Sequence, residues 1–229
     1  MKKITCLFFT LFCIVSYMNA QQTLSDAPNF NKYAESNKAI MMQNERVVFI
    51  GNSITEGWVN MRPDFFISNN YIGRGIGGQT SPQLLLRFRQ DVVNLRPAVV
   101  VINIGTNDIA ENTGKYNPQF TIDNIKSMAD IAKANGIKVI LSAVLPVGEY
   151  PWRKEIKNVP QTIDALNKEI KVFAEANGYG YIDYNTPMRQ ADGSMIESYA
   201  SDGVHPTVEG YKVMEQLADE VIKEVLIRY

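Results

Sequence analysis

Three continuous apolar segments constrain the fold of this chain more than any other feature of its sequence. They cover residues 47–50, 98–104 and 137–144, and none of them alternates between apolar and polar positions. A strand that contacts the core with one face alternates, whereas a strand covered by helices on both faces is apolar throughout. The three segments therefore predict the central strands of a parallel sheet between two layers of helices.

Segments with helical periodicity separate these strands. Apolar residues recur at helical spacing over residues 81–95, 120–135, 162–177 and 206–227. Asn-Gly pairs at residues 135–136 and 177–178 predict left-handed caps that end two of these helices. Pro206 is expected in the first turn of the last one.

Three further elements complete the predicted fold. Shorter strands are expected at residues 71–73 and 179–183, and a leading helix on the outside of the fold at residues 22–45. Strands and helices then alternate along the chain, without a repeat or an interdomain linker. This order predicts an α/β protein, a three-layer α/β/α sandwich with a mostly parallel five-stranded sheet, in one domain over residues 21–229.

The first 20 residues have the pattern of a secretory signal peptide. Lys2 and Lys3 precede an apolar run over residues 4–18, and the small residue Ala20 follows it. The run is shorter than the roughly 20 residues that a membrane-spanning helix needs. We therefore predict cleavage after Ala20 and export to the periplasm or the medium. An uncleaved amino-terminal anchor is the alternative.

Composition and charge exclude several classes of function. Cys6 and Cys13 are the two cysteines of the chain, and both lie in the predicted signal peptide, which excludes disulfides and thiolate chemistry in the mature domain. Histidines and carboxylates do not cluster at metal-ligand spacing, so we expect neither a metal nor an organic cofactor. With a formal net charge of −1 and no basic patch, nucleic acid is not an expected partner. Stable membrane insertion after signal cleavage is not expected, and the sequence leaves the oligomeric state open.

Polar, glycine-containing clusters follow three of the predicted strands, at residues 51–55, 75–80 and 105–108. Open α/β sheets bind ligands at the carboxyl ends of their strands, and glycine lets backbone N–H groups come close to a ligand. A fourth cluster at residues 201–206 precedes the last predicted helix. These clusters are the candidate functional site.

Ser53 lies in the first cluster, and Asp202 and His205 lie in the fourth. A lone histidine is most often a structural or surface residue, and a serine after a strand is often a helix cap. However, an aspartate three residues earlier can hold one ring nitrogen and leave the other for a nucleophile. Histidine is also the usual general base near neutral pH. The combination favours nucleophilic catalysis at Ser53.

The four clusters resemble the motif blocks of the SGNH hydrolases, also called GDSL-like esterases, particularly the members similar to platelet-activating-factor acetylhydrolase. The family's Gly-Asp-Ser block appears as residues 51–53, its second-block glycine as Gly78, its Gly-x-Asn-Asp block as residues 105–108 and its Asp-x-x-His block as residues 202–205. One short motif recurs by chance, whereas four in order, within a resemblance over residues 47–211, are specific. The resemblance implies a flavodoxin-like SGNH sandwich and a serine ester hydrolase.

The resemblance also implies a role for each matching residue. Ser53 is then the nucleophile, His205 the general base and acid, and Asp202 the residue that orients the imidazole. The oxyanion would be held by the backbone N–H groups of Ser53 and Gly78 and by the side-chain amide of Asn107. Loss of one such donor typically lowers the rate about a hundred- to a thousand-fold.

The chain departs from the family at Asn52, where the family usually has aspartate. That aspartate is not a triad member, so we expect altered local electrostatics rather than loss of activity. Asp108 is expected to tie its loop together by hydrogen bonds, and Glu56 to be a first-turn helix residue rather than a base. Arg74 either lies near the site or stabilises the fold.

Three aromatic residues, Trp58, Tyr150 and Trp152, are candidate substrate contacts. Together they could form a platform for a sugar ring or an acyl chain, or they could cover the edge of the core. Residues 73–78 also match the Gly-x-Gly-x-x-Gly pattern of a dinucleotide-binding loop. The strand before this match is very short, and the next predicted strand ends in Gly105 rather than in the acid that holds a ribose, which argues against a dinucleotide.

The leading hypothesis is an ester hydrolase that acts without a cofactor through an acyl-serine intermediate on a small-molecule or glycan ester. Export and the resemblance favour deacetylation of carbohydrate esters. A lipid or lysophospholipid acylhydrolase is the alternative within the same class. A non-catalytic glycan-binding module and an acyltransferase are the alternatives outside it.

Overall fold

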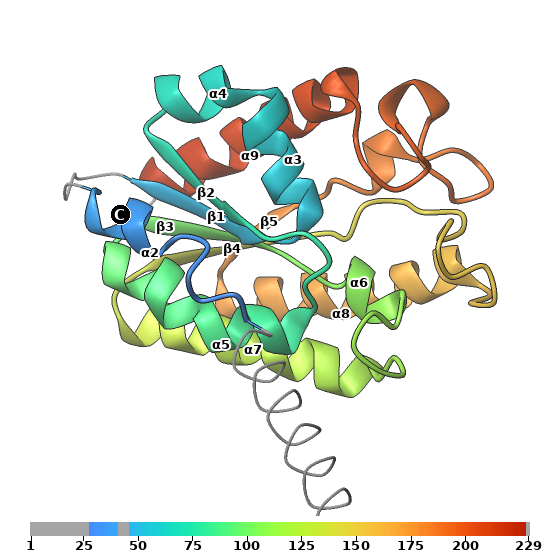
Figure 1. Cartoon of the computed structure of the whole chain (residues 1–229), viewed down its shortest axis with the longest axis horizontal. Coiled ribbons are helices and arrows are strands. Elements are labelled where there is room, and N and C mark those ends of the chain that lie inside the picture. Colours follow the sequence, from blue (N-terminus) through green and yellow to red (C-terminus); the bar gives the residue numbers. More distant parts are fainter. Residues whose placement is uncertain (1–27, 41–45, 228–229) are drawn as a thin grey trace, which may run out of the picture.

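The computed structural model describes residues 28–40 and 46–227 and has a five-stranded sheet at its centre (Figure 1). All neighbouring strands are parallel, in the order β2-β1-β3-β4-β5. The strands are β1 (Val47–Gly51), β2 (Tyr71–Gly75), β3 (Val99–Asn103), β4 (Lys138–Ser142) and β5 (Gly180–Ile182). The five strands predicted from sequence are confirmed.

Helices cover both faces of the sheet (Figure 1). One face carries α3 (Ser53–Met61), α4 (Pro63–Ser68) and α9 (Val208–Ile227). The other carries α5 (Ser81–Asp91), α6 (Thr106–Ile109), α7 (Pro118–Ala134) and α8 (Val159–Asn177). Short 3₁₀ segments lie at Val93–Leu95, Thr186–Met188 and Glu197–Tyr199. The predicted three-layer α/β/α sandwich is therefore confirmed.

Each central strand places alternate side chains in two separate cores. Val48 and Ile50 of β1 pack with residues of α5, α7 and α8, whereas Val47 and Phe49 pack with residues of α3, α4 and α9. Successive side chains of a strand point to opposite faces, so a strand covered on both sides must be apolar at every position. Burial of one such side chain stabilises the fold by about 1.5–3 kcal/mol. This double burial explains the continuous apolar segments of the sequence.

Two helices end at the predicted glycines. Gly136 follows α7 with φ +72° and Gly178 caps α8 with φ +68°, the left-handed conformation that glycine adopts at little cost. By contrast, α9 begins at Val208, so Pro206 precedes the helix and is not in its first turn. Thr207 caps this helix instead, because its Oγ1 accepts a hydrogen bond from the Gly210 N–H at 3.2 Å.

The predicted leading helix over residues 22–45 is wrong for the part of it that the structure describes. Within residues 28–40 only α2 (Ala34–Lys38) is helical, and turns precede it. Asparagine side chains, frequent in this segment, compete for backbone hydrogen bonds and favour turns. Asn37, for example, donates to Asp91 Oδ1 at 2.8 Å, which holds the segment against α5.

The predicted signal peptide, residues 1–20, lies outside the described residues. Over residues 28–40 and 46–227, the structure contains no helix with the length and apolar character needed to cross a membrane.

The sheet topology places three polar loops side by side. Gly51, the last residue of β1, is in register with Gly75 of β2 on one side and with Asn103 of β3 on the other. The chain passes from β1 to β2 and then crosses back to β3, so β1 is the point where the strand order reverses. Crevices at such a point, at the carboxyl ends of the strands, are the usual ligand sites of open α/β sheets.

Candidate active site

Ser53 is the first residue of α3, immediately after β1 and its cap residue Asn52. The Asn52 Oδ1 atom accepts a hydrogen bond from the Ile54 N–H at 3.0 Å, which is the usual capping interaction. An aspartate could accept the same bond. The Asn52 Nδ2 atom is buried and has no hydrogen-bond partner among the described residues, which leaves this amide group unpaired.

The loop before α9 brings Asp202 and His205 to Ser53. The distance between Asp202 Oδ2 and His205 Nδ1 is 2.8 Å, and that between His205 Nε2 and Ser53 Oγ is 2.9 Å. Since an ionised carboxylate can only accept, it favours the ring tautomer with the proton on Nδ1. The Nε2 atom is then free to accept the proton of the Ser53 hydroxyl. The three residues thus form one hydrogen-bonded chain.

Asp202 also holds its own loop in place. Its Oδ1 atom accepts hydrogen bonds from the backbone N–H groups of Val204 at 3.0 Å and of His205 at 2.8 Å. Burial raises the pKa of the Asp202 carboxyl, but the hydrogen bonds from His205 and Val204 outweigh this effect, and the pKa lies below its ordinary value. The carboxylate is therefore ionised at neutral pH, as the orientation of His205 requires.

The glycine loop after β2 lies beside the serine. A Cβ atom added to Gly77 would lie 3.9 Å from Ser53 Cβ, which places this part of the loop next to the start of α3. The next residue, Gly78, has φ +75°, a conformation that most side chains disfavour. The Gly77 N–H donates to Glu56 Oε2 at 2.7 Å, so Glu56 anchors the loop and is engaged as an acceptor.

Asn107 lies in α6, at the carboxyl end of β3, and is buried. One N–H of its amide donates to the Gln79 carbonyl at 3.0 Å, which joins α6 to the glycine loop. A primary amide carries a second N–H, which leaves one donor for a ligand. The structure thus joins the loop containing Gly78 to Ser53 on one side and to Asn107 on the other.

Asp108, beside Asn107, connects α6 to α5, as expected for a residue that ties its loop together. Its carboxylate accepts from the Ser81 backbone N–H at 3.0 Å, from the Ser81 hydroxyl at 2.5 Å and from the Thr121 hydroxyl at 3.3 Å. Burial raises the pKa of Asp108 above its ordinary value, and these hydrogen bonds oppose the shift only in part.

Two of the three aromatic candidates are not substrate contacts, so this prediction is wrong for Trp58 and Tyr150. Trp58 is 2% exposed and stacks on Phe65 and Tyr211 inside the core. Tyr150 is 0% exposed, and its hydroxyl lies 3.1 Å from Thr106 Oγ1. Both rings are enclosed because their large apolar faces fill the core beneath the loops. The positions of Trp58 and Tyr150 in the sequence did not indicate that their side chains point into the core.

Trp152 remains accessible at the site. Its side chain is 43% exposed, and its ring lies over the ring of His205 with centroids 6.2 Å apart and an interplanar angle of 30°. Its indole N–H donates to Asn112 Oδ1 at 3.2 Å, which fixes the orientation of the ring. Tyr150 supports it from below, with centroids 5.5 Å apart. An aromatic face therefore borders the hydrogen-bonded chain.

Two grooves are lined in part by sequence neighbours of Trp152. A groove of about 510 Å³ beside Gly78 has a predominantly polar lining, which consists of Asn29, Ile76, Gly77, Gly78, Gln79, Gln83, Asn112, Thr113 and Arg153. A groove of about 470 Å³ beside Asp202 is lined by Gly148, Glu149, Pro151, Asp192, Ser194, Asp202 and Gly203. Arg153, which follows Trp152 in the sequence, lines the groove beside Gly78, and Pro151, which precedes Trp152, lines the groove beside Asp202.

Arg74 does not belong to the site. Its guanidinium donates to Asn37 Oδ1 and to the Gly73 carbonyl, each at 2.8 Å, and it lies 4.6 Å from the ring centroid of Tyr33. Of the two roles considered for Arg74, the structure therefore supports stabilisation of the fold. Within the described part of the chain, the histidine and the acidic side chains form no cluster of three or more that could hold a metal ion.

Sequence reasoning missed Gln79 and Arg87, which connect these loops. Arg87 lies on the apolar side of α5 between Leu84 and Phe88, and Asp91 follows it one helical turn later. A charged pair at i,i+4 spacing on a helix face that is otherwise apolar indicates a buried ion pair. That signal was present in the sequence, although it does not identify what else Arg87 contacts.

Comparisons with known proteins agree with this fold. A GDSL-like lipase from Bacteroides thetaiotaomicron is 54% identical, has a TM-score of 0.85 and is matched over 86% of this chain and 98% of its own. An acetylxylan esterase from Xylanibacter ruminicola is 25% identical over 88% of this chain, which spans about half (47%) of that relative. An isoamyl acetate-hydrolyzing esterase from Saccharomyces cerevisiae is 24% identical over 80% of this chain and 87% of its own.

A comparison with a family model covers most of the described residues, including Asp202, His205 and Ser53. The sequence model of the GDSL-like lipase/acylhydrolase family matches residues 49–213, which include Ser53, Gly78, Asn107, Asp202 and His205. The chain therefore belongs to the GDSL-like lipase/acylhydrolase family.

Proposed function

We propose that the chain is a serine ester hydrolase that deacylates carbohydrate esters. The observation that carries this proposal is the unbroken chain from Asp202 through His205 to Ser53, with distances of 2.8 Å and 2.9 Å. A serine hydroxyl becomes a useful nucleophile only when a base removes its proton. In the proposed mechanism His205 removes this proton, and Asp202 holds the ring and stabilises the imidazolium that forms.

In the first half of the reaction, Ser53 Oγ attacks the ester carbonyl carbon and His205 Nε2 takes the hydroxyl proton. The carbonyl π electrons move to oxygen and form a tetrahedral oxyanion. When the C–O bond to the alcohol breaks, His205 returns the proton to the leaving oxygen, and an acyl-serine remains. Water then attacks this ester with His205 as the base, and the collapse releases the acid and restores the Ser53 hydroxyl.

The oxyanion is proposed to accept hydrogen bonds from the backbone N–H groups of Ser53 and Gly78 and from the second N–H of the Asn107 amide. All three are neutral donors held in place by the protein, so they need little reorganisation when the negative charge develops. The position of Gly77 next to Ser53 and the bond from Asn107 to the Gln79 carbonyl at 3.0 Å support this assignment.

The lining of the grooves supports a carbohydrate rather than a lipid as the natural substrate. The groove beside Gly78 has amide, hydroxyl and guanidinium groups and one large apolar residue, Ile76. Such a surface can pair with sugar hydroxyls, whereas a long acyl chain would leave those polar groups desolvated and unpaired. The half-exposed ring of Trp152 offers a flat apolar face of the kind on which a pyranose can stack. The acetyl esters in the names of two relatives also support a short acyl group.

The activity is tested with the purified protein and p-nitrophenyl acetate, butyrate, octanoate and palmitate. The expected result is a kcat/KM that is highest for acetate and falls steeply with acyl length. A preference for octanoate or palmitate would overturn the carbohydrate proposal in favour of a lipid acylhydrolase. Acyl transfer to added xylose that exceeds hydrolysis would indicate an acyltransferase, and binding of acetylated xylooligosaccharides without turnover would indicate a binding module.

Trp152→Ala tests the proposed sugar contact. We expect the KM for acetylated xylooligosaccharides to rise about tenfold, the equivalent of about 1.4 kcal/mol of lost stacking. The kcat/KM for p-nitrophenyl acetate, which lacks a sugar, should stay within about threefold of the wild type. Phe120→Ala, which removes an aromatic ring that is 53% exposed on α7, is the matched control. Equal KM changes for both esters would contradict a sugar-specific role of Trp152.

Export of the protein is also proposed, on the pattern of residues 1–20 alone. Amino-terminal sequencing of the protein from the native host's culture medium or periplasm tests it, with cleavage after Ala20 as the expected result.

A further inference from the structure

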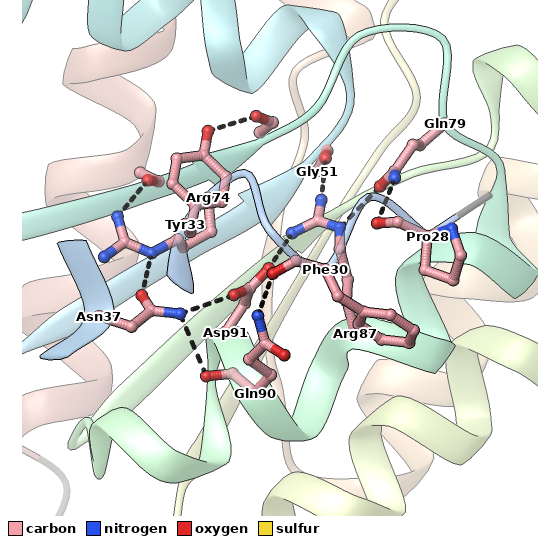
Figure 2. A network of polar contacts seen from close by, with 12 residues as sticks. Pro28, Phe30, Tyr33, Asn37, Gly51, Arg74, Gln79, Arg87, Gln90 and Asp91 are labelled. Atoms are coloured by element: carbon pink, nitrogen blue, oxygen red, sulfur yellow. Dashed lines mark hydrogen bonds and ion pairs between the residues drawn. The ribbon is translucent and has the colours of Figure 1, made fainter. Parts of the chain in front are cut away.

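Arg87 is a fully buried cation in α5 and makes three side-chain hydrogen bonds in three directions (Figure 2). Its Nε donates to Gln79 Oε1 at 2.6 Å, and one terminal nitrogen donates to the Gly51 carbonyl at 2.8 Å. The other terminal nitrogen donates to Asp91 Oδ2 at 2.9 Å. The bond to Asp91 balances the charge. The other two bonds go to segments of the candidate active site.

The bond to Gly51 holds the turn that carries the nucleophile. Gly51 is the last residue of β1, two residues before Ser53, and its carbonyl also accepts from the Ile76 N–H at 3.1 Å. The backbone is tightly enclosed at this point, because a Cβ atom added to Gly51 would lie 2.7 Å from the Asn103 carbonyl oxygen. Arg87 therefore contacts a carbonyl that also links the end of β1 to the start of the glycine loop.

The bond to Gln79 holds the other two proposed oxyanion donors. Gln79 directly follows Gly78, so the position of its side chain constrains the Gly78 peptide. Its backbone carbonyl accepts the bond from Asn107 at 3.0 Å. Its side-chain Nε2 donates to the Pro28 carbonyl at 2.9 Å, so the segment before α2 also holds the Gln79 side chain in position (Figure 2). One guanidinium thus connects to the elements that carry all three donors.

We propose that Arg87 is a positioning residue that sets the spacing between the Ser53 turn and the loop carrying Gly78 and Asn107, and so the geometry of the oxyanion hole. This inference rests on the proposed function. A guanidinium is a planar fork whose donors are fixed relative to one another, so two acceptors bound to it are held at a defined separation. A lysine could keep the ion pair with Asp91 but could not hold both acceptors in this way.

A purely structural role makes a different prediction. If Arg87 only stabilised the fold, its loss would lower the free energy of unfolding and leave the kcat of the folded fraction unchanged. A displaced donor instead lowers kcat, because the oxyanion exists only after the attack, and it leaves KM nearly unchanged. A misplacement of about 1 Å can lower a rate about a hundredfold.

The test uses Gln79→Met and Arg87→Lys, assayed with p-nitrophenyl acetate alongside thermal unfolding. Gln79→Met is the more informative variant, because it removes the acceptor of Arg87 Nε but retains the buried Arg87–Asp91 pair and the Gln79 carbonyl that binds Asn107. We expect each variant to lower kcat about 10- to 100-fold with KM within about twofold. Gln79→Glu, which retains an acceptor for Arg87 and loses the donor to Pro28, should recover most of the kcat.

The matched control is Ile222→Ala. Ile222 is fully buried in α9, three residues before Val225, whose carbonyl accepts a hydrogen bond from Lys138 at the amino end of β4. Its truncation should destabilise the fold without lowering kcat. If Gln79→Met and Arg87→Lys lower kcat no more than Ile222→Ala does, the proposal is overturned. An inactive wild type would refute the proposed function instead. In that case crystal structures of the wild type and Gln79→Met decide the present inference, which fails if the Ser53 N to Gly78 N distance is unchanged.

Discussion

Replacement of Ser53 by alanine is expected to lower kcat for p-nitrophenyl acetate by about 10⁴-fold or more. The variant lacks the Ser53 oxygen atom that would bond to the carbonyl carbon of the substrate. His205 is held by Asp202, so in the variant the imidazole would keep its position but would have no hydroxyl to deprotonate. The measurement is steady-state hydrolysis by the purified variant, with active-site titration of the wild type to count functional sites.

The stability of the Ser53→Ala variant should change little, because the α3 cap is the Asn52 side chain and not Ser53. Ser127→Ala is a suitable control, since it removes a hydroxyl that donates to the Asp123 carbonyl at 2.8 Å on α7. This control should retain the wild-type kcat. Residual activity of more than about 1% in Ser53→Ala, after contamination is excluded, would show that another residue is the nucleophile and would refute the mechanism.

Asp202→Asn is expected to lower kcat about 10³- to 10⁴-fold while the fold is retained. The Asn Oδ1 atom can still accept from the Val204 and His205 backbone N–H groups, at the present distances of 3.0 Å and 2.8 Å, so the loop keeps its shape. The new Nδ2 donor, however, faces His205 Nδ1 and favours the ring tautomer with its proton on Nε2. That nitrogen then donates to Ser53 Oγ and cannot accept its proton. NMR of the His205 ring nitrogens and the kcat for p-nitrophenyl acetate at neutral pH measure both effects.

The same variant should change the acid stability of the protein. The pKa of Asp202 in the folded protein lies below its ordinary value, which is about 3.9 in an unfolded chain. The ionised carboxylate therefore stabilises the fold above that pH, and this contribution is lost as the pH falls through the folded-state pKa. Wild type and Asp202→Asn should accordingly differ most in stability near neutral pH and converge as the pH falls through the folded-state pKa of Asp202.

Ser201→Ala is the loop control for Asp202→Asn, since Ser201 Oγ donates to the His205 carbonyl at 2.9 Å and does not touch the ring. Its kcat should stay within about threefold of the wild type, because the loop retains the Ser201 N–H bond to the same carbonyl at 2.8 Å. If Asp202→Asn were as active as Ser201→Ala, Asp202 would not orient the base.

The parallel sheet was predictable because burial on both faces leaves a direct mark on the sequence. Residues 47–50 and 98–102 are apolar at every position, and the structure places their alternate side chains in two cores. Within residues 28–40 the leading helix was predicted wrongly because this part of the chain is held by side-chain hydrogen bonds such as that from Asn37 to Asp91. Such contacts depend on residues distant in the sequence and produce no local periodicity.

The candidate triad was also accessible from the sequence, because Ser53, Asp202 and His205 lie in short motifs with a defined chemistry. Their roles remain predictions until the variants are measured. The aromatic residues behaved differently. Trp58, Tyr150 and Trp152 are all large aromatic residues. Trp58 and Tyr150 are nevertheless enclosed in the core, whereas Trp152 borders the site. The direction of a side chain in a loop depends on the packing of neighbouring elements, which local sequence does not encode.

The sequence by itself determined the α/β class, the positions of the strands and the polar clusters at their carboxyl ends, because periodicity, glycine caps and short motifs are local properties. Only the tertiary structure decided which side chains meet across the chain. The contact between Ser53 and His205 spans 152 residues, and that between Arg87 and the Gly51 carbonyl spans 36. These contacts follow from strand order and register, which bring distant loops to one edge of the sheet, and the identity of a residue does not reveal its partner there.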